Sequence, residues 1–507
     1  MTIRIDSRLA HPLFGISSTR RLEAGAAAGM AAPTLMALAG ASVARLARAL
    51  APHAGHIWVA CGPGNNGGDG FEAAAQLRLA GVAATVVFGG EAAGLPADAR
   101  MACDRARQAG VPIIRVPPDE VDAGDLYIDA VLGLGSSSRQ TTGWIRNLLD
   151  AVHRAPCPVL CVDLPSGLSA DTGQYVEDLA PAGPPKAQRH TLSLITLKPG
   201  LFTAQGRDAA GTVWFDSLGV DHGDLQPDAV LSGRPVTATR SHASHKGTFG
   251  DVGILGGEGI DRRGMGMSGA ALLAGTAALH SGAGRVLVAV LDTAHRLTAD
   301  PSQPELMLRK PEALDLAAGT LVCGCGGGEA VLEWLPRVLR SAPRLVLDAD
   351  ALNHIAADTG LQQLLAARAL RQWATVLTPH PLEAARLLGV DTATVQADRL
   401  AAAHQLAARH ACVVALKGSG TVIAAPGCIA AVNPTGNGRL ATAGTGDVLA
   451  GMTGASLATL NPREMPTMLA TFDAVCRAVF RHGQLADDWP DHVPLTASGL
   501  ARQSSGR

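Results

Sequence analysis

The feature that most constrains the fold is an alternation of short runs rich in Val, Ile and Leu with longer segments rich in Ala and Leu. Short apolar runs are typical of strands buried on both faces, and the longer segments are typical of the helices that cover them. This rhythm predicts parallel β-sheets packed between helices, so the fold class is α/β. The expected strands span residues 56–61, 84–88, 125–131, 158–163, 190–197 and 211–215 in the first half, and 251–255, 285–290, 320–323, 344–348, 374–378 and 411–416 in the second.

The chain has 507 residues, more than one hydrophobic core normally supports. The alternation is lost over residues 219–245, where Gly, Pro, Asp, Ser and His accumulate as in a solvated connection. We therefore predict two domains, residues 1–230 and 231–507. The first has the pattern of a Rossmann-like, doubly wound αβα sandwich, and the second has a further α/β pattern interrupted by one hairpin. Residues 462–507 are expected to be helical and to end in a frayed polar tail.

The charge balance argues against two classes of partner. With 42 Lys and Arg against 44 Asp and Glu, the net charge of −2 creates no field that would draw the protein onto nucleic acid or an anionic membrane. Charged residues precede any apolar run at the N-terminus, and no later segment is long and apolar enough to span a bilayer. We expect a soluble, cytoplasmic protein whose nine cysteines are reduced and buried.

A dense glycine string marks the first candidate site. Strand 56–61 leads into Gly62-Pro63-Gly64-Asn65-Asn66-Gly67-Gly68-Asp69-Gly70, and a helical pattern follows from Phe71 to Ala80. A turn of this kind directs backbone N–H groups and a positive helix terminus to one point, which suits a phosphate group. Glycines alone could also serve only tight backbone geometry.

The whole string resembles the GNNGGDG signature of the NAD(P)H-hydrate epimerase family, the YjeF-type N-terminal domain. Residues 129–133 (DAVLG) and 162–167 (VDLPSG) resemble two further elements of that family, in the same order. The resemblance implies that a potassium ion is held by Asn66, Asp129 and Ser166. It implies dinucleotide binding by Asn65, Asn66, Gly67, Gly68, Asp69, Gly133, Leu134, Gly135, Ser136, Ser137, Ser138 and Arg139.

Asp163 ends an apolar strand, at the edge where α/β folds place ligands. Taken alone it could equally be a structural acid. The resemblance places it against the hydrated nicotinamide, where inversion of the hydroxyl-bearing carbon needs a proton donor and acceptor. We predict that Asp163 is the acid/base residue of the first domain.

The second candidate site is marked by residues 433–437 (NPTGN) and 443–451 (AGTGDVLAG). A Gly-Thr-Gly-Asp turn that opens an apolar helix offers N–H donors to a transferring phosphoryl group, with Asp447 ready to accept a proton. A bare tetrapeptide of this kind could also be an ordinary helix start. In context it resembles the anion hole and catalytic Asp of ribokinase-like enzymes.

Three motifs, 245–250 (HKGTFG), 377–383 (LTPHPLE) and 416–421 (LKGSGT), narrow the resemblance to the NAD(P)H-hydrate dehydratase branch. His380 could instead be a helix cap. The resemblance implies magnesium and ADP as requirements of the second domain. It implies contacts to the hydrate from Ala270, Gly326, His380 and Asp447, and contacts to the nucleotide from Lys417, Gly418, Ser419, Gly420, Thr421 and Gly446.

Together the two resemblances predict a bifunctional repair enzyme for the hydrated cofactors NADHX and NADPHX. The first domain would interconvert the R and S epimers, and the second would dehydrate the S epimer at the expense of ADP, giving AMP and phosphate. We expect a homo-oligomer. One alternative is a ribokinase-like small-molecule kinase with a dinucleotide-binding regulatory domain, because the Gly-Thr-Gly-Asp site alone does not separate the two activities. Another is a first domain that only binds nucleotides or partners.

Overall fold

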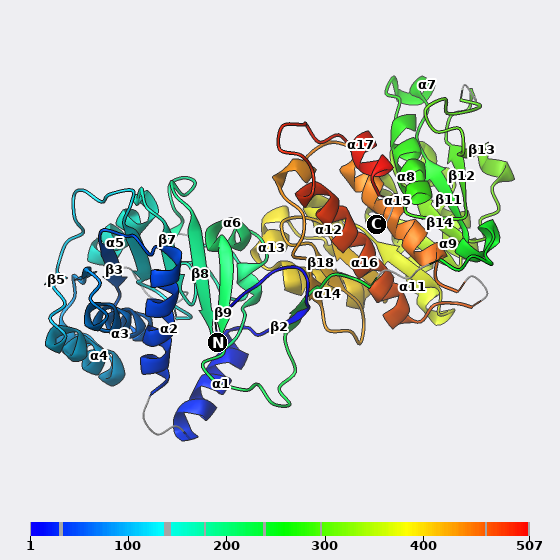
Figure 1. Ribbon diagram of the computed structural model, residues 1–507. Coiled ribbons are helices and arrows are strands. Elements are labelled where there is room, and N and C mark those ends of the chain that lie inside the picture. The colour runs from blue at the N-terminus through cyan, green and yellow to red at the C-terminus, as the bar shows by residue number, and fades with distance from the viewer. Residues whose placement is uncertain are drawn as a thin grey trace. The chain divides into compact units, whose positions relative to one another are not determined.

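The computed structural model describes residues 2–29, 34–135, 143–176, 179–236, 240–294, 297–461 and 464–504. The chain forms two compact units, each with its own sheet (Figure 1). The first unit comprises Met1–Asp6 and His11–Ala229, and the second comprises Ser7–Ala10 and Val230–Arg507. Each unit is a layered arrangement of helices on a sheet, which confirms the predicted α/β class.

The sheet of the first unit has the strand order β1-β9-β8-β7-β6-β3-β4-β5. All neighbours from β9 to β5 run parallel, and only β1 is antiparallel. The strands are β1 (Ile3–Arg4), β3 (Ile57–Cys61), β4 (Ala84–Val87), β5 (Ile113–Ile114), β6 (Leu126–Ala130), β7 (Val159–Val162), β8 (Arg189–Leu194) and β9 (Thr212–Asp216), and a short strand β2 (His11–Leu13) lies outside this order. The helices are α1 (Ile16–Gly29), α2 (Leu35–Leu50), α3 (Asn65–Leu79), α4 (Ala97–Gln108), α5 (Gly143–Arg154) and α6 (Gly206–Ala210).

The order of these strands reverses beside β3, because β4 and β5 extend the sheet to one side and β6 to β9 extend it to the other. Helices α2, α3 and α4 belong to one hydrophobic core, whereas α5 belongs to a second. A doubly wound sheet binds ligands where its strand order reverses, just beyond the carboxyl ends of the strands. The first candidate site should therefore lie beyond β3 and β6.

In the second unit the strand order is β13-β12-β11-β14-β15-β16-β17-β18-β19-β10. The strands from β13 to β17 run parallel, and β17, β18 and β19 form the expected antiparallel hairpin region. Its strands are β10 (Ala229–Leu231), β11 (Asp251–Gly256), β12 (Arg285–Val290), β13 (Met307–Arg309), β14 (Thr320–Cys323), β15 (Arg344–Leu347), β16 (Ala374–Leu377), β17 (Val413–Leu416), β18 (Val422–Ala424) and β19 (Ala431–Val432). Its helices are α7 (Ile260–Arg263), α8 (Ser268–His280), α9 (Leu335–Ser341), α10 (Asp350–Ala357), α11 (Thr359–Leu370), α12 (Pro381–Leu388), α13 (Thr392–Ala397), α14 (Arg399–His410), α15 (Thr445–Ala458), α16 (Met468–Asp487) and α17 (Ala497–Arg502).

Two expectations about irregular segments were wrong. The segment 219–245 contains strand β10, whose Ala229 and Leu231 are fully buried and which pairs with β19. The C-terminal tail is not frayed as far as Ser504, because Leu500 and Ala501 of α17 are buried in a core shared with α8 and α15. Both segments are rich in polar residues and Gly or Ser, so their few apolar side chains gave little periodic signal.

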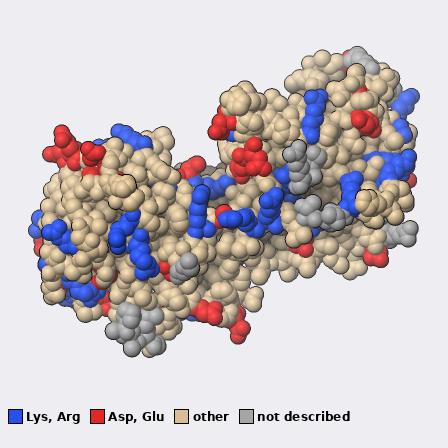
Figure 2. Space-filling model, in the orientation of Figure 1, with Lys and Arg blue, Asp and Glu red and all other residues tan. Residues whose placement is uncertain are grey.

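The surface carries both signs of charge without segregation on the face that Figure 2 shows, where Lys and Arg alternate with Asp and Glu. Among the described residues, no helix combines the length and the apolar character needed to cross a membrane. All nine cysteines are free thiols, and seven of them are buried.

Candidate active sites

The glycine string of the first unit is mostly helix rather than turn. Helix α3 begins at Asn65, so the prediction that the helix starts at Phe71 was wrong. None of the glycines from Gly62 to Gly70 has a positive φ. A methyl group at Gly62 would lie 1.7 Å from the Val131 carbonyl oxygen, and one at Gly67 would lie 2.0 Å from the Gly62 carbonyl oxygen. The glycines therefore let α3 start in direct contact with the strand ends.

Asn66, Asp129 and Ser166 are brought together around the carbonyl oxygen of Leu132. That oxygen accepts hydrogen bonds from Asn66 Nδ2 (3.1 Å) and Ser166 Oγ (3.2 Å). Ser166 Oγ also lies 2.5 Å from Asp129 Oδ1, and the backbone N–H of Ser166 donates to Asp129 Oδ2 at 3.0 Å. Asp129 and Ser166 are each only 1% exposed. The oxygens of Asp129 and Ser166 thus lie together next to the Leu132 carbonyl oxygen, with the Asn66 amide on the same carbonyl group, and oxygens of this kind suit a hard cation.

Asp163 follows β7 in a left-handed conformation, with a φ of 67°. This conformation is strained for a residue other than glycine, so the surrounding structure must hold Asp163 in it. Lys198, which follows β8 and is fully buried, donates to Asp163 Oδ1 and to the Leu194 carbonyl oxygen (2.8 Å). The Leu194 N–H also donates to Asp163 Oδ1 at 3.0 Å. The first site therefore contains a buried carboxylate–lysine pair at adjacent strand ends.

Two more acids adjoin this pair. Burial raises the pKa of Asp69 well above its usual value, and the negative charges of Asp163 and Glu23 raise it further. The pKa of Glu23, from α1, is raised by burial and by Asp163, against the opposing effects of Lys198 and Arg20. Asp69 and Glu23 therefore both hold their protons more tightly than an isolated acid of the same kind does.

The predicted substrate loop is described only in its first part. Gly133 lies beside Asn66, because a methyl group there would be 3.3 Å from the Asn66 Cβ atom, and Gly135 faces the Arg20 guanidinium group of α1. Leu134 lies between them in the same turn. Ser136, Ser137, Ser138 and Arg139 lie outside the described residues.

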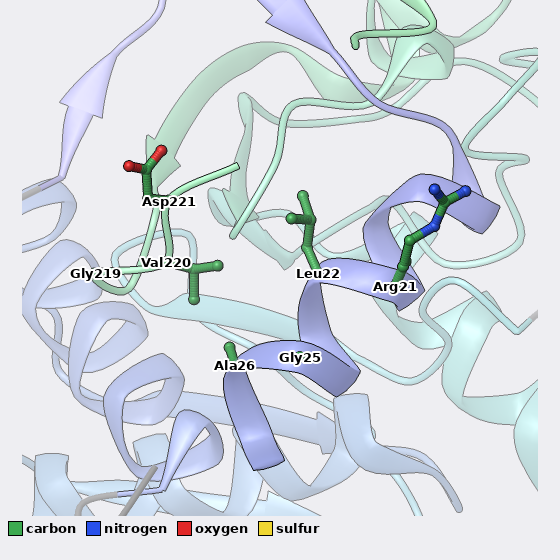
Figure 3. A pocket seen from close by; sticks show the side chains of 7 residues that line it. All are labelled: Arg21, Leu22, Gly25, Ala26, Gly219, Val220 and Asp221. Atoms are coloured by element: carbon green, nitrogen blue, oxygen red, sulfur yellow. The ribbon is translucent and has the colours of Figure 1, made fainter. Parts of the chain in front are cut away.

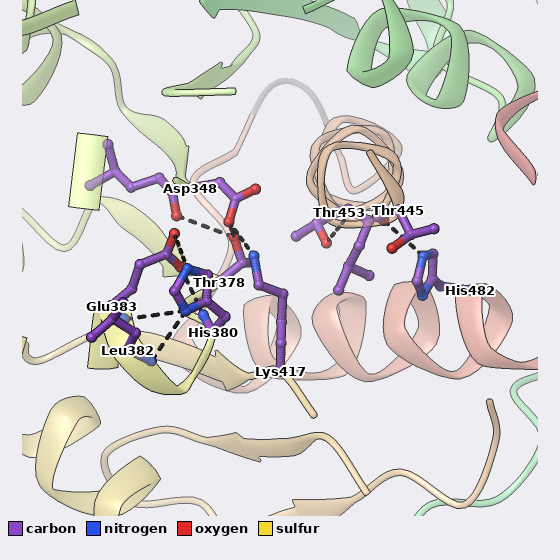
Figure 4. A network of polar contacts seen from close by, with 11 residues as sticks. Asp348, Thr378, His380, Leu382, Glu383, Lys417, Thr445, Thr453 and His482 are labelled. Carbon is purple, nitrogen blue, oxygen red and sulfur yellow. Dashed lines mark hydrogen bonds and ion pairs between the residues drawn. The ribbon is translucent and has the colours of Figure 1, made fainter. Parts of the chain in front are cut away.

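In the second unit, each of four adjacent parallel strands is followed by a residue whose side chain can take part in binding or catalysis. Cys325 follows β14, Asp348 follows β15, Thr378 follows β16 and Lys417 follows β17. Lys417 Nζ donates to Asp348 Oδ1 at 2.6 Å, and Thr378 Oγ1 donates to the same oxygen at 2.8 Å (Figure 4). Parallel strands end at one edge of a sheet, so residues far apart in the sequence meet here.

Asp447 lies in the first turn of α15 and faces this row of side chains. Its carboxylate, the Asp348 carboxylate and the Cys325 sulfur all lie within 4.8 Å of one another. Burial raises the pKa of Asp447 to about 6, and the negative charge of Asp348 adds to the effect, while Lys417 and Cys325 oppose it. A carboxylate with such a pKa is ionised at neutral pH and is a stronger base than an ordinary aspartate.

The residues that were predicted to bind the nucleotide lie around Lys417. A methyl group at Gly446 would lie 3.4 Å from Lys417 Nζ, so the start of α15 adjoins the ammonium group. Gly418 and Gly420 have φ values of 142° and 62°, which only glycine adopts readily. Ser419 and Thr421 complete this turn, and Thr421 Oγ1 donates to the Gly418 carbonyl oxygen at 3.3 Å.

His380 is the N-cap of α12. Its Nδ1 accepts hydrogen bonds from the N–H groups of Leu382 (3.1 Å) and Glu383 (3.3 Å), and Glu383 Oε2 accepts from the His380 N–H at 2.8 Å. The structure thus shows the capping role directly, and the His380 side chain remains 46% exposed. Ala270 and Gly326 adjoin each other, because a methyl group at Gly326 would lie 2.8 Å from the Ala270 Cβ atom.

Comparison with known proteins places both units. A protein of Escherichia coli strain K12 named bifunctional NAD(P)H-hydrate repair enzyme Nnr is 35% identical to this chain, over 94% of this chain and 90% of its own length. This chain belongs to the bifunctional NAD(P)H-hydrate repair enzymes. The family model described as YjeF-related protein N-terminus matches residues 32–200 of this repair enzyme, and the one described as NAD(P)H-hydrate dehydratase matches residues 253–503.

Two further relatives match the second unit of the repair enzyme. The ADP-dependent (S)-NAD(P)H-hydrate dehydratase of Neisseria meningitidis serogroup B is 39% identical, over 52% of this chain and 86% of its own length. A crystal structure of ADP/ATP-dependent NAD(P)H-hydrate dehydratase from Bacillus subtilis, co-crystallized with ATP/Mg2+, is 31% identical and covers 52% of this chain and 91% of its own, with a TM-score of 0.40.

Several charged residues of the repair enzyme's sites were not predicted from the sequence. Asp348 ends the predicted strand 344–348, as Asp163 ends 158–163, and Lys198 directly follows the predicted strand 190–197, so the same signal could have found both. Glu23 and Arg20 lie on α1, far from any motif in the sequence. Cys325 belongs to no motif described above, and its contact with Asp447 depends on the fold.

Proposed function

We propose that the first unit, assigned to residues 1–230, interconverts the R and S epimers of NADHX and NADPHX, and that the second, residues 231–507, dehydrates the S epimer with ADP to give NAD(P)H, AMP and phosphate. The observation that carries this proposal is that each unit holds an aspartate–lysine ion pair at the carboxyl edge of a parallel sheet, Asp163–Lys198 in the first unit and Asp348–Lys417, beside Asp447, in the second. Family membership favours dehydration over a small-molecule kinase activity.

In the first unit, Asp163 is the acid/base residue for the hydroxyl-bearing carbon. Lys198 holds one carboxylate oxygen in place and, being buried, has few other partners for its charge. The dinucleotide would be bound by the start of α3, from Asn65 to Asp69, and by the loop 133–139. Asn66, Asp129 and Ser166 would hold the potassium ion, because the oxygens of Asp129 and Ser166 are hard ligands that lie together and the Asn66 amide adjoins them at the Leu132 carbonyl group. The ion would supply fixed positive charge beside the anionic dinucleotide.

In the second unit, Lys417 and the glycine-rich turn through Thr421 bind the nucleotide, with the first N–H groups of α15 at Gly446 directed at its phosphates. Ala270, Gly326 and His380 contact the hydrate. Asp447, with a pKa of about 6, removes the proton from the ring hydroxyl as that oxygen accepts the phosphoryl group. Phosphate is a better leaving group than hydroxide, so elimination then restores the dihydropyridine.

The described residues do not form a cage for magnesium. The cluster of Cys325, Asp348 and Asp447 contains a thiol, a soft ligand that magnesium does not favour, and Asp348 is already bound by Lys417. Magnesium would therefore enter with the nucleotide phosphates. We further propose that the enzyme is cytoplasmic and forms a homo-oligomer.

The test uses each separated hydrate epimer with the full-length protein, with and without ADP and potassium. Recovery of the absorbance of the reduced cofactor from both epimers is expected, and the R epimer should require both sites. Asp163→Asn should stop epimer interconversion and leave ADP-dependent dehydration of the S epimer intact, whereas Asp447→Asn should do the reverse. Failure of the wild-type protein to regenerate reduced cofactor would favour a kinase, and unchanged interconversion in Asp163→Asn would leave the first unit without its acid/base residue.

A further inference from the structure

Helix α1 is tied to the first site at its N-terminal end. The N–H groups of Gly15 and Ile16 donate to Asp228 Oδ2 and Asp171 Oδ1, both at 2.8 Å. One turn later, Thr19 Oγ1 lies 2.7 Å from Thr196 Oγ1, and both threonines are buried. This contact fixes one face of α1 against the segment that leads to Lys198.

Glu23 lies on that same face, because residues four apart in an α-helix are neighbours and Glu23 follows Thr19 by four. Glu23 therefore lies on the face of α1 that packs against Thr196, and its carboxyl group interacts electrostatically with Asp163 and Lys198. Other residues of α1 line a pocket of about 500 Å³, whose lining includes neither Glu23, Asp163 nor Lys198 (Figure 3). That pocket is lined by Arg21, Leu22, Gly25, Ala26, Gly219, Val220 and Asp221.

The electrostatic environment agrees with this placement. Burial and the charge of Asp163 raise the pKa of Glu23, while Lys198 and Arg20 oppose the shift. At Asp163, Lys198 Nζ and the Leu194 N–H both donate to the Oδ1 atom. Within the described part of the chain, Asp163 Oδ2 accepts no hydrogen bond. Glu23 thus holds its proton more tightly than an isolated glutamate does, and the Oδ2 atom of Asp163 is available to a substrate.

We propose that Glu23 is a second catalytic residue of the epimerase, which exchanges a proton with the substrate hydroxyl on the face of the ring opposite Asp163. This inference rests on the proposed function of the first unit. Hydration of a dihydronicotinamide leaves the hydroxyl on the carbon bonded to the ring nitrogen, and the two epimers differ at that carbon.

The proposed step conserves atoms and charge. Glu23 gives its proton to the hydroxyl oxygen, the carbon–oxygen bond breaks with its electron pair on oxygen, and the departing group is water. The nitrogen lone pair forms a carbon–nitrogen double bond, and the resulting cation lies among the carboxyl groups of Glu23, Asp69 and Asp163. Water then bonds to the carbon from the other face and passes a proton to Asp163. In the reverse direction the two acids exchange roles.

The test is the rate of epimer interconversion in full-length Glu23→Gln, with the uncatalysed rate subtracted. Loss of a general acid is expected to lower kcat at least about 100-fold, with ADP-dependent dehydration of the S epimer unchanged. Arg21→Gln is the matched control, because it changes an exposed charge on the other side of α1 and should leave both rates unchanged. Interconversion by Glu23→Gln within about twofold of the wild-type rate would overturn the inference.

A pH profile separates catalysis from structural support. The groups that face Glu23 are Asp163, Lys198, Arg20 and Asp69. Wild-type kcat/KM should fall on the alkaline side as Glu23 loses its proton, Glu23→Asp should retain this limb at lower activity, and Glu23→Gln should lack it. An unchanged alkaline limb in Glu23→Gln would also overturn the inference. A wild-type protein that does not interconvert the epimers would instead overturn the proposed function of the first unit.

Discussion

Asp447 should weaken the fold of the second unit at the pH where it supports catalysis. Its pKa rises from 3.8 to about 6, chiefly because of burial and then because of Asp348. The folded state therefore holds this proton more tightly than the unfolded chain does. Between these two pKa values stability falls as pH rises, and above about pH 6 the full penalty is present. A shift of about two units corresponds to about 3 kcal/mol.

Asp447→Asn removes this penalty, because an amide of nearly the same shape carries no charge to desolvate. We expect the variant to lack dehydratase activity and yet to be more stable than the wild type, by about 1–3 kcal/mol at pH 8. At pH 4, where the wild-type carboxyl group is protonated in the folded state, the gain should largely disappear. Loss of function and gain of stability would then come from the same buried carboxylate.

Calorimetric unfolding at pH 8 and pH 4 measures this difference. The transition of the second unit is identified by its upward shift when ADP is added to the wild-type protein. Asp473→Asn is the matched control, since Asp473 is an exposed residue of α16 and its substitution should change stability little at either pH. An Asp447→Asn variant no more stable than the wild type at pH 8, or equally stabilised at both pH values, would refute the argument.

Three further predictions concern the two sites. Lys417→Met leaves the Asp348 carboxylate buried without its cation, so ADP-dependent dehydration should be lost and the second unit should be about 3 kcal/mol less stable by calorimetry; stability equal to that of the wild type would contradict the ion-pair argument. Gly67→Ala places a methyl group 2.0 Å from the Gly62 carbonyl oxygen, so epimer interconversion should be lost by chromatographic assay while dehydration of the S epimer persists. Replacement of potassium by lithium, or Ser166→Ala, should lower the interconversion rate at least about tenfold, and an unaffected rate would exclude the ion site around Leu132.

The sequence by itself determined the sheets and the positions of the two sites along the chain. The apolar pattern of a strand and the amphipathic pattern of a helix are local properties, so runs such as 158–163 and 285–290 could be assigned from their own residues. The motifs at Asn65 and Gly444 are also continuous segments, each attached to one helix start. Where the carboxyl end of a predicted strand carried an aspartate, as at Asp163, the position of the site followed from the fold class.

The tertiary structure alone decided which side chains meet. Lys198 lies 35 residues from Asp163, and Lys417 lies 69 residues from Asp348, yet each pair forms because parallel strands end side by side. No period in the sequence records such a contact, and Glu23 interacts electrostatically with Asp163 only because the fold packs α1 against Thr196. The protonation of these acids likewise depends on burial, which arises only when distant segments exclude water together.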